Sequence, residues 1–200
     1  SLQLFSFAIL ISVSHSYLFC AKGFSVLVTA LTNRALMEVA DKLRESLIKE
    51  HKVYKTNLTT DEAKEVNGIQ NAEKVYAIPG KLMLSTFYIA SGSAVNGYEG
   101  PLFDYVIVDE ASQAFFAMLA ATNMLGYKKL WVGDVYQMPP IVLMSHDRIK
   151  RQGYEPLVNG LDTITSSNKY SNYQLSDTFR LGTNAAKLTG FKIDIKLSSR

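Results

Sequence analysis

The chain has 200 residues, of which 48% are hydrophobic and 20% are charged, and its formal net charge is +3. This composition excludes an intrinsically disordered chain, and the length suffices for one domain with a sizeable core. The single cysteine, Cys20, excludes an internal disulfide framework and favours a cytoplasmic location. The mild positive charge permits a polyanionic partner but does not require one.

The first 21 residues carry no Lys, Arg, Asp or Glu, and apolar side chains dominate positions 2–19. A signal peptide or membrane span is one interpretation of this stretch, and a buried helix is the other. The stretch lacks a basic leading region and several serines interrupt it, so we expect the buried helix. His15 and Cys20 are expected to be packed side chains, because no partner at metal-ligand spacing lies nearby.

A buried strand is predicted at residues 26–30, where the sequence reads VLVTA. Thr32 and Asn33 follow it, and both residue types cap helices well. Apolar residues then recur at helical spacing, which predicts a helix with one buried face; they are Leu36, Val39, Ala40, Leu43 and Leu47.

Residues 51–80 are polar and weakly patterned, and we interpret them as a surface excursion or small insertion. A helix start is predicted near Thr59, and the lysines of this region are expected to be solvated and near a phosphate backbone; they are Lys52, Lys55, Lys64 and Lys74. A strand is predicted at residues 82–87, followed by a Gly- and Ser-rich loop over residues 91–100.

The next strand is an unbroken apolar run, residues 105–108, followed directly by Asp109 and Glu110. Such a run suits a strand covered on both faces, as in a parallel sheet, where ligands bind at the carboxyl ends of strands. Adjacent acids at that point can divide two roles, one holding Mg²⁺ and the other orienting or deprotonating a water. By itself the pattern fits a solvated acidic turn equally well.

A second apolar strand, predicted at residues 129–132, ends in Gly133 and Asp134, and a proline pair then stops regular structure. Residues 114–128 lie between the two strands and suffice for one crossover helix. The unit therefore predicts two parallel strands whose acidic ends fall on the same edge of the sheet. The charged stretch that follows, residues 146–151, is expected to be a solvated face.

Five segments resemble motifs of superfamily 1 helicases. DEASQ at 109–113 resembles motif II, and GDVYQMPP at 133–140 resembles motif III. Residues 26–36 resemble motif Ia and residues 82–87 resemble the Ser-Thr motif Ic. Residues 173–180 resemble motif IV, with Phe179 at the position where the family has Tyr.

The resemblance implies an α/β fold of the RecA-like P-loop NTPase type, a parallel sheet with helices on both faces. It implies ATP and Mg²⁺ as cofactors and ATP-dependent translocation and unwinding as the activity. By residue, it assigns Asp109 to the metal, Glu110 to activation of the attacking water and Gln137 to sensing of the γ-phosphate. Asp134 would shape the loop beside the nucleotide, and Arg180 would be the arginine finger.

The implied partner is a single nucleic-acid strand, with DNA expected before RNA. Thr29, Thr32, Asn33 and Thr86 would touch its backbone. Contacts of this kind are polar and carry little sequence information.

The phosphate-loop pattern G-x-x-x-x-G-K-[ST] does not occur in the sequence. We therefore interpret residues 1–180 as a partial first motor domain and residues 181–200 as the start of a second motor domain. We expect the 200-residue chain to be inactive alone. One alternative is a nucleic-acid-binding module that has lost hydrolysis. Another is the motor of a helicase-nuclease or recombination ATPase.

Overall fold

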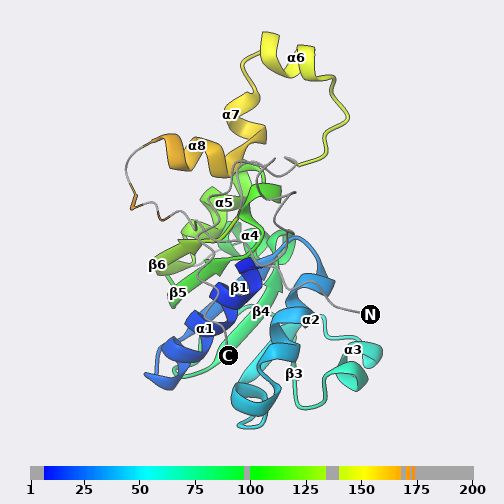
Figure 1. Ribbon diagram of the computed structural model, residues 1–200, viewed down its shortest axis with the longest axis vertical. Helices are drawn as coiled ribbons and strands as arrows, with labels where there is room; N and C mark the ends of the chain where they lie inside the picture. The colour runs from blue at the N-terminus through cyan, green and yellow to red at the C-terminus, as the bar shows by residue number, and fades with distance from the viewer. Residues whose placement is uncertain (1–6, 97–99, 134–139, 168–169, 172, 174–200) are drawn as a thin grey trace, which may run out of the picture.

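The computed structural model describes residues 7–96, 100–133, 140–167, 170–171 and 173 (Figure 1). Its centre is a six-stranded sheet in the order β3-β2-β4-β1-β5-β6. Every neighbouring pair of strands is parallel. The strands are β1 (Val26–Ala30), β2 (Val53–Thr56), β3 (Gln70–Ala72), β4 (Leu82–Thr86), β5 (Phe103–Val108) and β6 (Gly126–Trp131).

Helices lie on both faces of this sheet, with α1 (Phe7–Ala21) and α2 (Asn33–Lys42) on one face and α4 (Phe87–Val95) and α5 (Phe116–Asn123) on the other (Figure 1). The remaining α-helices of the described residues are α3 (Thr60–Glu65), α6 (His146–Arg151), α7 (Glu155–Val158) and α8 (Gly160–Ser166). Successive strand side chains point to opposite faces, so Val28 packs with α1 and α2 and Leu27 packs with α4 and α5. The predicted α/β class with helices on both faces is confirmed, and it agrees with a RecA-like fold.

From Phe7 the apolar start of the chain is a helix, α1, as expected, but this helix is only partly buried, since Leu10, Tyr17 and Leu18 are exposed. Cys20 is buried, and this burial raises the pKa of its thiol to about 12. The His15 ring nitrogen Nδ1 lies 2.9 Å from the Ile11 carbonyl oxygen one turn earlier. Among the described residues, the structure has no helix of the length and apolar character needed to cross a bilayer.

Helix α2 begins as the sequence predicts, because the Thr32 hydroxyl accepts a hydrogen bond from the Ala35 N–H at 3.2 Å. The apolar positions predicted for its buried face are all in the core. The helical ladder changes at Leu43, and a short π-helical turn (Arg44–Ile48) carries the chain toward β2.

Residues 51–80 are not an insertion, which corrects the expectation from sequence. Two strands, β2 and β3, extend the sheet on one side, and α3 connects them. Lys55 is also not solvated, since its side chain is 0% exposed and its ammonium lies 3.0 Å from Glu62 Oε2 on α3. The strands β2 and β3 are short and polar, so their sequence pattern does not predict that they pair with neighbouring strands.

The stretch predicted as a loop at 91–100 is helical as far as Val95, the end of α4. Ala90 and Ala94 are buried on its inner side. Small side chains let a helix approach the sheet closely, and the Ser and Gly residues of α4 lower the helical signal of the sequence. The crossover helix expected between the acidic strand ends is present as α5, and β5 and β6 are parallel neighbours.

Candidate functional site

The carboxyl ends of β1, β5 and β6 are joined by backbone hydrogen bonds. The Asp109 N–H donates to the Thr29 carbonyl and the Val132 N–H donates to the Val108 carbonyl, both at 2.8 Å. The Ala111 N–H then donates to the Val132 carbonyl at 2.8 Å. These bonds place Asp109 at the edge of the sheet where parallel strands bring their ligands.

The Asp109 side chain is fully buried. Neither of its carboxylate oxygens has a hydrogen-bond partner among the described residues, and the buried hydroxyl of Ser12 on α1 has none either. Burial raises the pKa of Asp109 to about 6. The nearby Ser12 hydroxyl and Glu110 backbone N–H oppose this rise in pKa, and the charges of Glu110 and Glu38 add to it. An unpaired buried carboxylate is costly unless a cation or donor completes it.

These groups fit a magnesium ion. Mg²⁺ takes oxygen ligands and binds through one or two carboxylates together with substrate phosphates and water. In the described part of the chain, no group of three or more His, Cys, Asp or Glu side chains could hold a metal ion, so substrate phosphates and water would have to supply most of its ligands. Asp109 would hold the ion, and the Ser12 hydroxyl offers a second oxygen on the same side.

Glu110 has a left-handed backbone, with φ 51° and ψ 41°. A residue with a Cβ adopts this conformation at a cost of order 1–3 kcal/mol, and such residues concentrate at functional sites. Glu110 is partly buried, and burial, followed by the charge of Glu38, raises its pKa. A carboxylate with a raised pKa is a stronger base near neutral pH.

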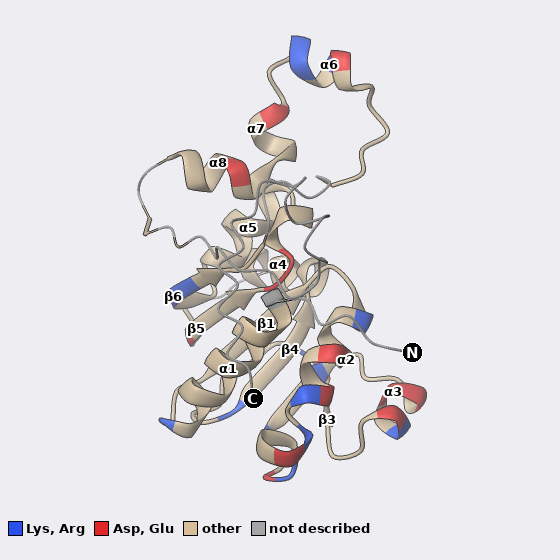
Figure 2. Cartoon of the chain, viewed as in Figure 1, with Lys and Arg blue, Asp and Glu red and all other residues tan. Residues whose placement is uncertain are grey.

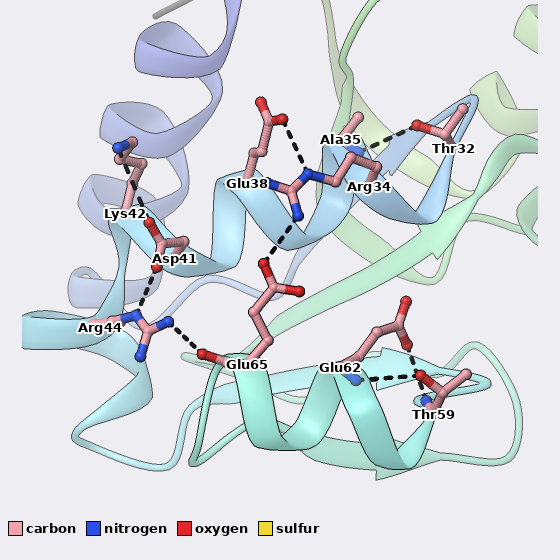
Figure 3. Close-up of polar contacts among 10 residues, drawn as sticks. All are labelled: Thr32, Arg34, Ala35, Glu38, Asp41, Lys42, Arg44, Thr59, Glu62 and Glu65. Atoms are coloured by element: carbon pink, nitrogen blue, oxygen red, sulfur yellow. Dashed lines mark hydrogen bonds and ion pairs between the residues drawn. The ribbon is translucent and has the colours of Figure 1, made fainter. Parts of the chain in front are cut away.

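Glu38 is an acidic neighbour that sequence reasoning missed. It lies on α2, and the Arg34 side chain reaches both Glu38 Oε1, at 3.4 Å, and Glu65 Oε1, at 2.9 Å (Figure 3). Its charge acts on Asp109 and Glu110 from across the sheet edge. Only the packing of α2 on the sheet brings these residues together, so no local sequence pattern predicts that Glu38 lies near Asp109 and Glu110.

The chain matches no protein-family model. An uncharacterized ATP-dependent helicase of Methanocaldococcus jannaschii, MJ0104, is 30% identical over 85 residues, which cover 42% of this chain and 12% of that protein. The DNA replication ATP-dependent helicase/nuclease DNA2 of Saccharomyces cerevisiae is 26% identical over 183 residues, which cover 86% of this chain and 11% of that protein. This chain resembles a superfamily 1 helicase motor.

A solved structure is also similar in part. A nuclease-deletion mutant of the type ISP restriction-modification enzyme LlaGI, in complex with a DNA substrate mimic, has a TM-score of 0.42 at 14% identity. The match covers 72% of this chain and 17% of that chain. A likeness of this size does not define the fold, which rests here on the parallel sheet itself.

The residues that the helicase resemblance assigns to nucleic acid gather at the ends of β1 and β4. Thr32 and Asn33 are exposed, and Thr86, which pairs with Ala30 across the sheet, is partly exposed. Thr29 is fully buried and its hydroxyl has no hydrogen-bond partner among the described residues. Contact between any of these residues and a nucleic-acid strand remains a prediction.

Asp134, Gln137 and Arg180 lie outside the described residues. The start of the segment that resembles motif III is described at Gly133. A Cβ at Gly133 would lie 2.9 Å from the Ser112 backbone nitrogen and 2.8 Å from Leu161 Cδ2. The segments that resemble motifs II and III therefore lie in direct contact, and a larger residue at position 133 would separate them.

Proposed function

We propose that this chain is part of the ATP-hydrolysing motor of a helicase that acts on nucleic acid. The observation that carries the proposal is the Asp109 carboxylate, buried and without a hydrogen-bond partner among the described residues, at the carboxyl edge of a parallel sheet. Such a group is poised for a cation, and the strained Glu110 follows it directly. The similarity to two proteins named as ATP-dependent helicases supports the same assignment.

In this proposal Asp109 would hold Mg²⁺, which would supply charge neutralisation to the phosphates of ATP. Glu110 accepts a proton from the attacking water, a role that its raised pKa suits. Gln137 senses the γ-phosphate, Asp134 shapes the loop beside it, and Arg180 stabilises charge on the transferred phosphoryl group. These last three roles rest on the motif resemblance.

The proposed partner is a single nucleic-acid strand, with DNA expected before RNA. Thr32 and Asn33 at the start of α2 and Thr86 at the end of β4 would meet the sugar-phosphate backbone. Hydroxyl and amide groups serve as backbone contacts and read little sequence. Unwinding would follow from the motion of this motor against the remainder of the protein.

The test is Glu110→Gln in the full-length protein. Gln keeps the shape of Glu but cannot accept the proton, so we expect ATP affinity within threefold of wild type and a kcat loss of at least about 10²-fold. Binding is followed with a fluorescent ATP analogue, and turnover is followed by phosphate release with saturating single-stranded DNA.

Glu73→Gln is the matched control, because Glu73 is an exposed glutamate on the surface of the described chain. It should leave both measurements unchanged. Turnover that survives Glu110→Gln nearly intact would make Glu110 a structural residue and would contradict the proposed function.

A further inference from the structure

An apolar groove that the proposed motor chemistry does not use lies between α6, α7, the segment before α6 and Phe115. The groove has a volume of about 380 Å³. It is lined by Phe115, Ile141, Leu143, Ile149, Tyr154 and Val158, among others. In Figure 1 the helices α6, α7 and α8 project beyond the carboxyl edge of the sheet, and α6 lies farthest from it.

The rim of this groove exposes large aliphatic side chains. Ile141 is 90% exposed and Leu143 is 107% exposed, whereas Ile149, on the inner side of α6, is buried. Removing apolar surface from water lowers the free energy in proportion to the area removed. Covering the rim with a partner would therefore be favourable.

The charges around the groove are separated. Helix α6 carries three exposed cations, Arg148, Lys150 and Arg151, against one carboxylate, Asp147. No ion pair joins these cations to a carboxylate within the described ranges, although the Arg151 side chain donates to the Asp147 carbonyl. The carboxylates Glu155 on α7 and Asp162 on α8 lie on helices without cations (Figure 2).

We infer that this groove docks an amphipathic segment of a partner protein, with acidic residues at the end of the segment that lies on α6. The lining is almost entirely hydrocarbon, which suits leucine-like side chains and leaves the hydrogen-bonding edges of a nucleic-acid base without partners. An amphipathic helix laid in an apolar groove is a common mode of peptide recognition. Complementary charge at α6 sets the orientation of the segment.

The groove is structurally connected to the acidic segment of the sheet. Phe115, one of its lining residues, directly precedes α5. Gly160, at the start of α8, packs so closely that a Cβ there would lie 2.8 Å from the Ala114 carbonyl oxygen and 2.7 Å from the Phe116 nitrogen. A docked segment would therefore contact the same short stretch of chain that follows DEASQ.

The experiment measures fluorescence anisotropy of a synthetic amphipathic peptide, labelled with fluorescein, that carries leucines on one face and glutamates in one half. The protein is the 200-residue chain. We expect saturable binding that weakens as salt rises, and binding at least about fivefold weaker for the same peptide with lysines in place of the glutamates.

Two double variants test the two halves of the groove. Ile141→Ser with Leu143→Ser should weaken binding at least about tenfold, since burial of one such side chain accounts for that factor. Arg148→Glu with Lys150→Glu should weaken binding of the acidic peptide and restore binding of the lysine peptide. All four side chains are exposed, so the fold should tolerate these changes.

The matched controls remove equal features elsewhere. Val95→Ser with Tyr127→Ser removes apolar side chains that are 76% and 67% exposed outside the groove, and Lys64→Glu reverses a charge that is 76% exposed on α3. Neither control should change peptide affinity.

Three results would overturn the inference. The first is no saturable peptide binding, or binding that the groove variants leave unchanged. The second is binding of labelled oligothymidylate that the peptide displaces and the groove variants abolish, which would assign the surface to nucleic acid. The third is a dimer in sedimentation velocity that Ile141→Ser with Leu143→Ser dissociates, which would assign it to a second copy of this chain.

Discussion

Asp109 lies in the interior with neither carboxylate oxygen hydrogen-bonded within the described part of the chain. Its charged form is destabilised in the folded state, because burial raises its pKa from 3.8 to about 6. Glu110, the next residue, is held in the left-handed region of φ. Both residues destabilise the folded state locally, and the rest of the structure offsets that free-energy cost, as is common at sites that act on a ligand.

Asp109→Asn should therefore stabilise the protein at high pH. In wild type the folded pKa lies above the unfolded one, so the folded state is favoured most when Asp109 is protonated and loses stability as pH rises from about 4 through 6. This shift corresponds to roughly 3 kcal/mol. We expect the variant to gain up to about 3 kcal/mol in the free energy of unfolding at pH 8, and little at pH 4.

Urea denaturation at both pH values measures this difference. Asp162→Asn, at an exposed aspartate on α8, is the control and should change neither value. If Asp109→Asn is no more stable than wild type at pH 8, the carboxylate has a partner that relieves its burial.

At the scale of elements, two close contacts join elements that strand pairing does not connect. Helix α8 packs on the segment after DEASQ through Gly160, where no space is left for a side chain. On the other side of the molecule, Lys55 at the end of β2 reaches Glu62 of α3, and Glu62 also completes a capping box with Thr59. The first contact joins α8 to the start of α5, and the second joins β2 to α3.

Gly160→Ala should destabilise the protein by about 1–3 kcal/mol, because the added methyl group would meet backbone atoms of Ala114 and Phe116 that cannot move freely. Gly92→Ala is the opposite case. Gly92 lies in α4 with no atom within 4 Å of an added Cβ, so alanine should stabilise the helix by roughly 0.5–1 kcal/mol. Thermal melts of the two variants would place them on opposite sides of wild type, and equal melting temperatures would contradict the packing of α8.

Lys55→Met should destabilise by roughly 3 kcal/mol, because it leaves the Glu62 carboxylate without its main cation while only 14% of that side chain is exposed. Burial acts to raise the pKa of Glu62, but hydrogen bonds from the Thr59 N–H and the Lys55 ammonium outweigh it, so the pKa is lowered.

The stabilisation from Lys55 and Glu62 is therefore present above the ordinary pKa of glutamate and is lost as pH falls through the lowered one. Lys64→Met is the control, since Lys64 and Asp61 are 76% and 97% exposed and their pairing contributes under about 1 kcal/mol. Chemical denaturation at neutral and acid pH separates the two variants. A loss for Lys55→Met that does not shrink at acid pH would mean that packing, and not charge, is what the substitution removes.

At the scale of the whole molecule, burial decreases outward from the centre of the sheet. The central strands β1, β4 and β5 are mostly buried, whereas β3 has three residues and α6 lies at the far end of the projecting helices (Figure 1). Local opening requires less free energy where fewer buried contacts are lost.

Native-state hydrogen exchange should reproduce that gradient. We expect the slowest amides in β1, β4 and β5, including those of Val28, Leu84 and Ile107, which are paired in register. Amides of α6 should exchange fastest among the helices. Equal protection of α6 and β1, measured by mass spectrometry, would indicate that the projecting helices form one cooperative unit with the sheet.

The sequence alone determined the features that arise from local periodicity. Continuous apolar runs predicted β1, β4 and β5, the uncharged start predicted α1, and the spacing between acidic strand ends predicted the crossover helix α5. The run at 129–132 predicted β6, but in the structure this strand begins earlier, at Gly126, and ends at Trp131. The position of Asp109 and Glu110 at the carboxyl edge followed from the same reasoning, because parallel strands end at one edge.

Only the tertiary structure decided the features that depend on distant neighbours. The strands β2 and β3 are too short and polar to be recognised until β4 pairs beside them, and Lys55 is buried because α3 folds Glu62 onto it. Helix α4 is held by the burial of Phe87, Ala90 and Ala94 against the sheet, and the Ser and Gly residues between them obscure its helical pattern in the sequence. The approach of Glu38 to Asp109 and the left-handed turn at Glu110 likewise depend on how α2, β5 and β6 meet, and pairing over such distances leaves no trace in a local pattern.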